Sequence, residues 1–174
     1  MSKALSIKVF SDGAVLETML HDLNSGLVTG FTTNPSLMKK AGITSYIGFA
    51  KDVLKEITDY PVSFEVFADD LEGMEQEARR IAALGDNVYV KIPVTNSKGE
   101  STAPLIDRLT AEGIKVNVTA IFTVEQVRVV VDALKSGTPA VVSVFAGRIA
   151  DTGVDPMPIM QEALAICRQK EGVE

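Results

Sequence analysis

Six short apolar runs, each followed by a segment with helical spacing, constrain the fold of this chain more than any other feature. The runs are rich in β-branched residues, as buried strands are. The segments behind them carry apolar residues three and four positions apart, as amphipathic helices do. The predicted strands cover residues 5–12, 27–33, 61–68, 88–94, 114–122 and 139–145. Unbroken alternation of this kind predicts a parallel sheet covered by helices, either doubly wound or of the barrel type.

Local signals set the boundaries of these predicted elements. Thr123 and Gln126 have the spacing of a helix capping box, and the Asp-Pro pair at 155–156 predicts the start of the last helix. The Asn-Pro step at 34–35 predicts a loop, because the residue before proline disfavours helix. No linker interrupts the alternation, so we predict a single domain over residues 1–174.

Motif content and chain length bear on the choice between a doubly wound sheet and a barrel. No GxGxxG motif follows the first strand, which weakens a dinucleotide-binding reading. A (β/α)8 barrel has eight strand–helix units and typically about 250 residues. This chain has 174 residues and six predicted units, two short of that number.

Composition excludes several classes of function. The net charge of −6 argues against a nucleic-acid partner, and no apolar run is long enough for a membrane span. The single cysteine, Cys167, excludes an internal disulfide, and a cytoplasmic location is the default expectation. The lone histidine, His21, has no metal-ligand spacing around it, so we predict no metal site. No cofactor motif appears either, so we predict no cofactor.

Lys91 lies in the middle of the fourth predicted strand, VYVKIPV at 88–94. If helices cover both faces of the sheet, this lysine is buried. A buried ammonium is costly, and a lysine that loses its proton in a dry site becomes a nucleophile suited to Schiff-base formation with a carbonyl substrate. Two alternatives stay open at this point: an edge strand that exposes Lys91 to water, or a buried ion pair with a carboxylate.

Each of the other predicted strands offers a polar side chain near its carboxyl end. In barrel enzymes these strand ends build the active site. Buried polar groups are costly without partners, so their convergence is difficult to explain by packing. The residues are Asp12, Thr32, Asn34, Glu65, Asn117, Thr119 and Ser143, with Phe145 beside Ser143 and Arg148 in the predicted loop behind it. A lysine among acids, amides, hydroxyls and a terminal arginine favours an active site for a phosphorylated carbonyl compound.

Five collinear motifs carry a resemblance to a known family. They are TTNPSL at 32–37, VSFEV at 62–66, VYVKIPVT at 88–95, KVNVTAIFT at 115–123 and SVFAGRIADTG at 143–153. In this order they resemble the transaldolases, including the small branch similar to fructose-6-phosphate aldolase. The resemblance implies the TIM (β/α)8-barrel fold class, with about six of its units in this chain.

The resemblance implies a class I aldol mechanism. Lys91 would form a Schiff base with the ketone of a sugar phosphate, and Asp12 would take the hydroxyl proton that starts carbon–carbon cleavage. Glu65 and Thr119 would position a water for the proton transfers of imine formation and hydrolysis.

The same resemblance assigns the substrate contacts. Asn34 and Asn117 would hold the three-carbon dihydroxyacetone unit, with help from Thr32 and Ser143. Arg148 would bind the substrate phosphate, for which a guanidinium is geometrically suited.

Two positions choose between the branches of the family. The aldolase-like branch has glutamine where this chain has Glu65 and tyrosine where it has Phe145, so this chain resembles true transaldolases. The expected reaction moves dihydroxyacetone from a ketose phosphate, such as fructose 6-phosphate or sedoheptulose 7-phosphate, to an aldose phosphate, a step of the pentose phosphate pathway. The alternatives are an aldolase that releases free dihydroxyacetone and a non-catalytic barrel fragment. A lysine aldolase acting on deoxyribose phosphate is disfavoured by the motif spellings.

The resemblance also implies a seventh strand beyond residues 172–174, so that this chain stops where that strand should begin. A sheet of six strands would leave two edges and apolar surface exposed, which is an aggregation liability. We therefore expect a truncated form, an impaired enzyme, or a homo-oligomer in which copies of the chain cover these surfaces.

Overall fold

The computed structural model describes residues 7–174, which form six strands, each followed by one or two of the eight helices. The strands are β1 (Phe10–Asp12), β2 (Gly30–Thr32), β3 (Val62–Glu65), β4 (Val88–Pro93), β5 (Val116–Ile121) and β6 (Ala140–Val144). The helices are α1 (Leu16–Asn24), α2 (Pro35–Lys40), α3 (Tyr46–Glu56), α4 (Leu71–Ala82), α5 (Ala103–Ala111), α6 (Val124–Ala133), α7 (Ala146–Asp151) and α8 (Met157–Cys167). The strands are parallel, and this succession confirms the predicted fold class, six βα units of the (β/α)8-barrel type.

The chain divides into two compact units. The first covers the described residues up to 65 together with 81–89, and the second covers 66–80 together with 90–174. In the first unit β2 lies between β1 and β3, and in the second β5 lies between β4 and β6. That residues 1–174 form a single domain therefore stays a prediction from the sequence.

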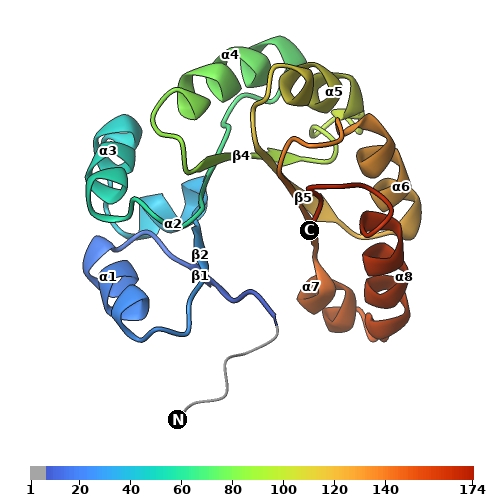
Figure 1. Ribbon diagram of the computed structural model, residues 1–174, viewed down its shortest axis with the longest axis horizontal. Coiled ribbons are helices and arrows are strands. Elements are labelled where there is room, and N and C mark those ends of the chain that lie inside the picture. The colour runs from blue at the N-terminus through green and yellow to red at the C-terminus, as the bar shows by residue number, and fades with distance from the viewer. Residues whose placement is uncertain (1–6) are drawn as a thin grey trace. The chain divides into compact units, whose positions relative to one another are not determined.

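The core of the first unit lies between its strands on one side and helices α1 and α3 on the other (Figure 1). These two helices contact each other. Phe31, Val62 and Phe64 of the strands are fully buried, as is Val53 of α3. Ser45 caps α3, because its hydroxyl accepts a hydrogen bond from the Gly48 N–H at 3.1 Å. The strand predicted over residues 5–12 begins at Phe10 in the structure, and residues 5 and 6 lie outside the described part.

The second unit is built on β4–β5–β6 with α5, α6 and α8 packed side by side (Figure 1). The capping box of α6 is confirmed: the Thr123 hydroxyl accepts from the Gln126 N–H, and the Gln126 side chain accepts from the Thr123 N–H. At the other end of α6 the Lys170 ammonium donates to the carbonyls of Val131, Asp132 and Leu134. A cation at the carboxyl end of a helix satisfies carbonyls that have no partner within the helix.

The last residues of the chain continue the sheet of the second unit. The Ala140 N–H donates to the Gly172 carbonyl at 2.8 Å, and the Glu174 N–H donates to the Ala140 carbonyl at 2.9 Å. Val173 forms a parallel bridge with Ala140. Residues 172–174 thus pair with β6, immediately before the point at which the resemblance implies a seventh strand.

Three helices correct the sequence prediction. The Asn-Pro step at 34–35 does not form a loop but starts α2, because proline suits the first helical position and Asn34 caps it. Arg148 lies within α7 rather than in a loop. The last helix begins at Met157, one residue later than predicted, although the Asp155 carboxylate still accepts from the Met157 N–H at 2.9 Å.

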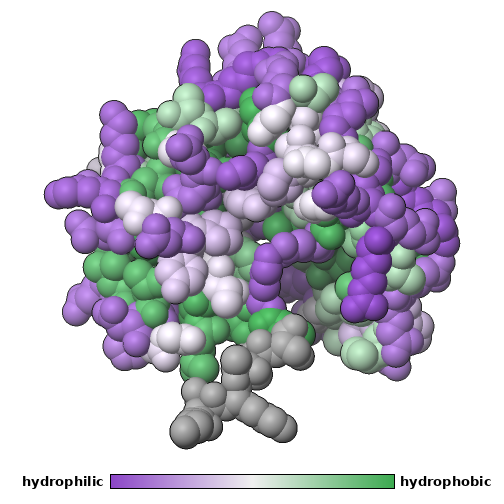
Figure 2. Space-filling model, in the orientation of Figure 1, coloured by the Kyte–Doolittle hydropathy of each residue, from purple (hydrophilic) through white to green (hydrophobic). Residues whose placement is uncertain are grey.

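Exposed hydrophobic side chains remain among the described residues. Figure 2 shows hydrophobic residues interspersed among hydrophilic ones on one face of the molecule. On and before α8, Val154, Met157, Met160 and Leu164 are each at least 37% exposed. In the described part of the chain, every helix is too short or too polar to cross a membrane.

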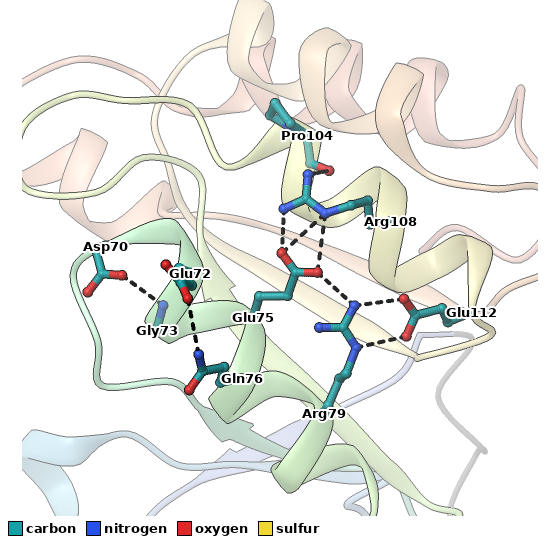
Figure 3. A network of polar contacts seen from close by, with 9 residues as sticks. All are labelled: Asp70, Glu72, Gly73, Glu75, Gln76, Arg79, Pro104, Arg108 and Glu112. Atoms are coloured by element: carbon teal, nitrogen blue, oxygen red, sulfur yellow. Dashed lines mark hydrogen bonds and ion pairs between the residues drawn. The ribbon is translucent and has the colours of Figure 1, made fainter.

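An ion-pair network joins α4 to α5 within the second unit (Figure 3). Glu75 accepts from the guanidiniums of Arg79 and Arg108, and Arg79 also donates twice to Glu112, at 2.8 and 3.0 Å. These hydrogen bonds, from Arg108 first and then Arg79, lower the pKa of Glu75 from 4.5 to about 2. The Glu75 carboxylate therefore favours the folded state only while it is ionised.

We expect Glu75→Gln to lower the free energy of unfolding by about 1 kcal/mol at pH 7, since a network exceeds an isolated surface pair. Because folding depresses this pKa, the contribution is complete above about pH 5 and is lost as the pH falls towards 2. Urea unfolding of the wild-type protein and of Glu75→Gln, at pH 7 and at pH 3, measures this contribution to the free energy of unfolding. Glu72→Gln is the matched control, because within residues 7–174 the Glu72 side chain accepts a single long hydrogen bond, from the Gln76 side chain at 3.4 Å. A difference as large at pH 3 as at pH 7 would contradict this account.

Candidate active site

Lys91 lies inside the sheet of the second unit and is 9% exposed. In β4 it pairs with Asn117 of β5, and on its other side its carbonyl accepts from the Val66 N–H at 3.1 Å. Hydrogen bonds on both sides of the strand exclude the alternative in which an edge strand exposes this lysine to water. The side chain is buried, as the sequence pattern predicted.

Three further predicted residues share a face with Lys91 within the second unit. Residues paired between parallel strands project to the same side, and the register pairs Lys91 with Asn117 and Pro93 with Thr119. Asn117 is 1% exposed and Thr119 is 2% exposed. The Ser143 hydroxyl of β6 donates to the Asn117 side-chain oxygen at 2.8 Å, which orients the amide so that its NH₂ group faces away from Ser143.

The Thr119 hydroxyl is a buried polar group without a hydrogen-bond partner among the described residues. Burying a hydroxyl in this way costs about 1–3 kcal/mol. Buried polar groups normally have a partner, so an exception indicates a water or ligand that completes the site. Thr119 has the chemistry to hold such a molecule on the face that carries Lys91.

The backbone of β5 changes direction immediately after Thr119. Ala120 has φ +58°, the one positive φ of a non-glycine residue in the described chain. The register with β6 shifts here, since Val118 pairs with Val142 but Ile121 pairs with Val144. One extra residue on β5 is a β-bulge, which reverses the alternation of the side chains beyond it.

The bulge brings Phe122 against Phe145. Their ring centroids lie 5.7 Å apart at an interplanar angle of 70°, an edge-to-face contact. Strict alternation in the sequence would place Ile121, and not Phe122, on the face of Asn117. In the structure Ile121 is fully buried while Phe122 is 41% exposed. Phe122 was therefore missed by sequence reasoning, because the sequence carries no signal for the positive φ of an alanine.

Arg148 projects from α7 into solvent. Its side chain is 74% exposed, and its nearest ion-pair contact is Nη1 to the Asp151 carboxylate at 3.8 Å. A weak contact of this length leaves the guanidinium available to a phosphate.

The first unit holds the other predicted residues, beginning with Asp12 and Thr32. They are register partners in β1 and β2, and the Thr32 hydroxyl donates to the Asp12 carboxylate at 2.7 Å. Asp12 is exposed. This hydrogen bond fixes the orientation of a carboxylate that water can reach.

Asn34 and Glu65 lie at the carboxyl ends of β2 and β3. The Asn34 side-chain oxygen accepts from the Leu37 N–H at 3.0 Å, which leaves its NH₂ as the donor group. Glu65 ends β3, and its backbone carbonyl accepts from the Tyr46 hydroxyl at 2.8 Å. Thr33 was not among the predicted site residues. Like Thr119, it has a buried hydroxyl without a hydrogen-bond partner among residues 7–174.

Two loops behind β3 and β4 are tied together within the second unit. The Asp69 carboxylate accepts from the Ser97 hydroxyl at 2.6 Å and from the Ser97 N–H at 2.8 Å. These two bonds, the hydroxyl first, lower the pKa of Asp69. They fix the loop that follows the strand of Lys91. Among the described residues, no group of three or more His, Cys, Asp or Glu side chains has the arrangement of a metal site.

Comparisons with known proteins show which proteins this chain is similar to. The chain is 42% identical over 163 residues to a protein of Methanococcus maripaludis (strain C7) called "Probable transaldolase", covering 92% of this chain and 70% of that protein. It is 41% identical to a "Probable transaldolase" of Thermoplasma volcanium, and the match covers 92% of this chain and 69% of that protein. It is 38% identical to a "Probable transaldolase" of Thermoanaerobacter sp. (strain X514), again over 92% of this chain and 69% of that protein.

A sequence model of one protein family matches residues 9–173, nearly the whole described chain. That stretch includes all six strands and every side chain assigned above to the candidate site. The match also agrees with the succession of parallel βα units. The chain belongs to the Transaldolase/Fructose-6-phosphate aldolase family.

Proposed function

We propose that this protein is a transaldolase that transfers a dihydroxyacetone unit between sugar phosphates through a Schiff base on Lys91. One observation supports this more than any other: Lys91 is buried beside Asn117, on the face that carries the unpartnered hydroxyl of Thr119. Imine formation requires the amine as a nucleophile, and the neighbouring amide and hydroxyl can bind the substrate and a water.

In the first step the Lys91 amine attacks the C2 ketone of a ketose phosphate such as fructose 6-phosphate. The carbinolamine loses water to give an iminium ion, and the oxygen that leaves needs a proton. Glu65 supplies that proton through a water, and the Thr119 hydroxyl holds the water by the hydrogen bond that it otherwise lacks.

Cleavage then breaks the C3–C4 bond of the substrate. Asp12 takes the proton of the C4 hydroxyl, the electrons of the bond move into the iminium, and an enamine of dihydroxyacetone stays on Lys91. The hydrogen bond from Thr32 orients the Asp12 carboxylate for this task. The leaving fragment of fructose 6-phosphate is glyceraldehyde 3-phosphate, and an aldose phosphate acceptor reverses the sequence.

Substrate positioning falls to the amides and the arginine. The NH₂ groups of Asn34 and Asn117 would bind the hydroxyls of the dihydroxyacetone unit, and Ser143 keeps the Asn117 amide in one orientation. Arg148 would bind the phosphate. Glu65 and Phe145 favour transfer over release of free dihydroxyacetone, because these two residues separate the branches that the sequence resembles.

Acceptor dependence tests the transferase assignment. We expect glyceraldehyde 3-phosphate to form from fructose 6-phosphate at least about tenfold faster when erythrose 4-phosphate is present, because the acceptor discharges the enamine. A coupled assay with and without the acceptor measures the two rates. Equal rates with release of free dihydroxyacetone would make the protein an aldolase. No product in either assay would favour the non-catalytic fragment.

A further inference from the structure

The β-bulge in β5 decides which side chain follows Thr119 on the face that carries Lys91. Without it, Ile121 would share the face of Asn117 and Thr119, and Phe122 would point to the opposite side. The positive φ at Ala120 and the register shift reverse that order. An alanine adopts this conformation only at a cost in strain, and such strain is typical of functional sites.

We propose that Phe122 is a positioning residue of the site, placed by the bulge at Ala120, and that it holds the Phe145 ring as an apolar wall that keeps water from the enzyme-bound dihydroxyacetone unit. The edge-to-face contact at 5.7 Å fixes the Phe145 ring. Phe145 follows Ser143 by two residues, and Ser143 bonds to Asn117 beside Lys91. The wall therefore belongs to the face that carries the nucleophile.

A hydrogen bond from its backbone N–H also fixes Phe122. Its N–H donates to the Gln126 side-chain oxygen at 2.8 Å, the same oxygen that closes the capping box of α6. This bond fixes the start of the loop behind β5. The 41% exposure of Phe122 shows that one part of the residue faces solvent while its ring contacts Phe145. This arrangement suits a barrier between water and the site.

The proposal rests on the proposed transferase function, because retention of the three-carbon unit defines that reaction. Premature release requires protonation of the enamine carbon, after which a water oxygen bonds to the imine carbon and the carbon–nitrogen bond to Lys91 breaks. An apolar wall slows this hydrolysis by excluding water. The ratio of dihydroxyacetone released to dihydroxyacetone transferred measures the effect directly.

Phe122→Ala is the main variant, and Val129→Ala is its control because Val129, on α6, is exposed to nearly the same extent, 40%. We expect Phe122→Ala to raise the ratio of release to transfer at least about fivefold, while borohydride still traps the adduct on Lys91. Phe122→Tyr keeps a ring edge for Phe145 and should restore most of the retention. A general loss of stability would lower both rates together and leave their ratio unchanged.

Ala120→Val tests how Phe122 is placed. A β-branched residue disfavours positive φ, so this variant should raise the ratio in the same direction as Phe122→Ala. Ala120→Gly should raise the melting temperature by about 2 °C, because glycine adopts this conformation without strain. If Ala120→Val does not fold, the two Phe122 variants still decide the question.

The outcomes separate this inference from the function beneath it. If wild-type protein traps the adduct and transfers it, but Phe122→Ala leaves the ratio unchanged, the positioning role is overturned and the transferase stands. If folded wild-type protein forms no adduct, the proposed function is overturned and the role of Phe122 with it. A raised ratio that Phe122→Tyr reverses supports the proposal.

Discussion

Lys91→Met is expected to lower the rate of dihydroxyacetone transfer at least about 10³-fold and to abolish trapping by borohydride, because the proposed covalent intermediate forms on the amine of Lys91. Methionine fills a similar length of buried side chain, so the folded state should persist. Steady-state rates with fructose 6-phosphate, together with circular dichroism, measure both effects.

The matched control for this variant is Lys98→Met. Lys98 is exposed in the loop behind β4, where its N–H donates to the Asn96 side-chain oxygen at 3.1 Å. Its side chain has no role in the proposed chemistry, so we expect an unchanged rate. Residual transfer above a tenth of the wild-type rate in Lys91→Met would refute a Schiff-base mechanism at this lysine.

Thr119→Val is expected to lower activity while changing stability little. Among the described residues this hydroxyl has no hydrogen-bond partner to lose, and valine has nearly the same shape, so the free energy of unfolding should change by less than about 1 kcal/mol. Loss of the hydroxyl that holds the catalytic water should lower the transfer rate about 10²-fold. Urea unfolding and the coupled assay give the two values.

Thr110→Val is the control for this exchange at a buried threonine with partners. The Thr110 hydroxyl donates to the Ile106 carbonyl at 2.8 Å and accepts from the Lys135 N–H at 3.2 Å. Its removal should cost about 1–2 kcal/mol of stability and leave the transfer rate unchanged. If Thr119→Val destabilised the protein as much as Thr110→Val, the hydroxyl of Thr119 would have a partner within the fold.

The sequence predicted the six strand–helix units because each has a clear hydrophobic period and a marked end. It missed α2 and α7, which have six residues each, too few for a period to show. The step at 34–35 read as a loop, yet asparagine followed by proline is also a suitable helix start. At such short elements only tertiary contacts decide between a turn and a helix.

The residues of the candidate site were predicted by strand parity and by resemblance, and their local contacts were not. Parity correctly indicated that Lys91, Asn117 and Thr119 share a face. It failed beyond Thr119, where the bulge at Ala120 adds one residue and exchanges Ile121 for Phe122. Neither parity nor propensity contains information about a positive φ at an alanine. The roles of Asp12 and Glu65 remain predictions from the resemblance.

The most direct test of the central proposal is borohydride reduction in the presence of fructose 6-phosphate, followed by intact and peptide mass spectrometry. The proposed mechanism predicts one dihydroxyacetone-sized adduct per chain, on the peptide that contains Lys91, and none in Lys91→Met. Absence of an adduct from protein shown to be folded, or an adduct on another lysine, would contradict it.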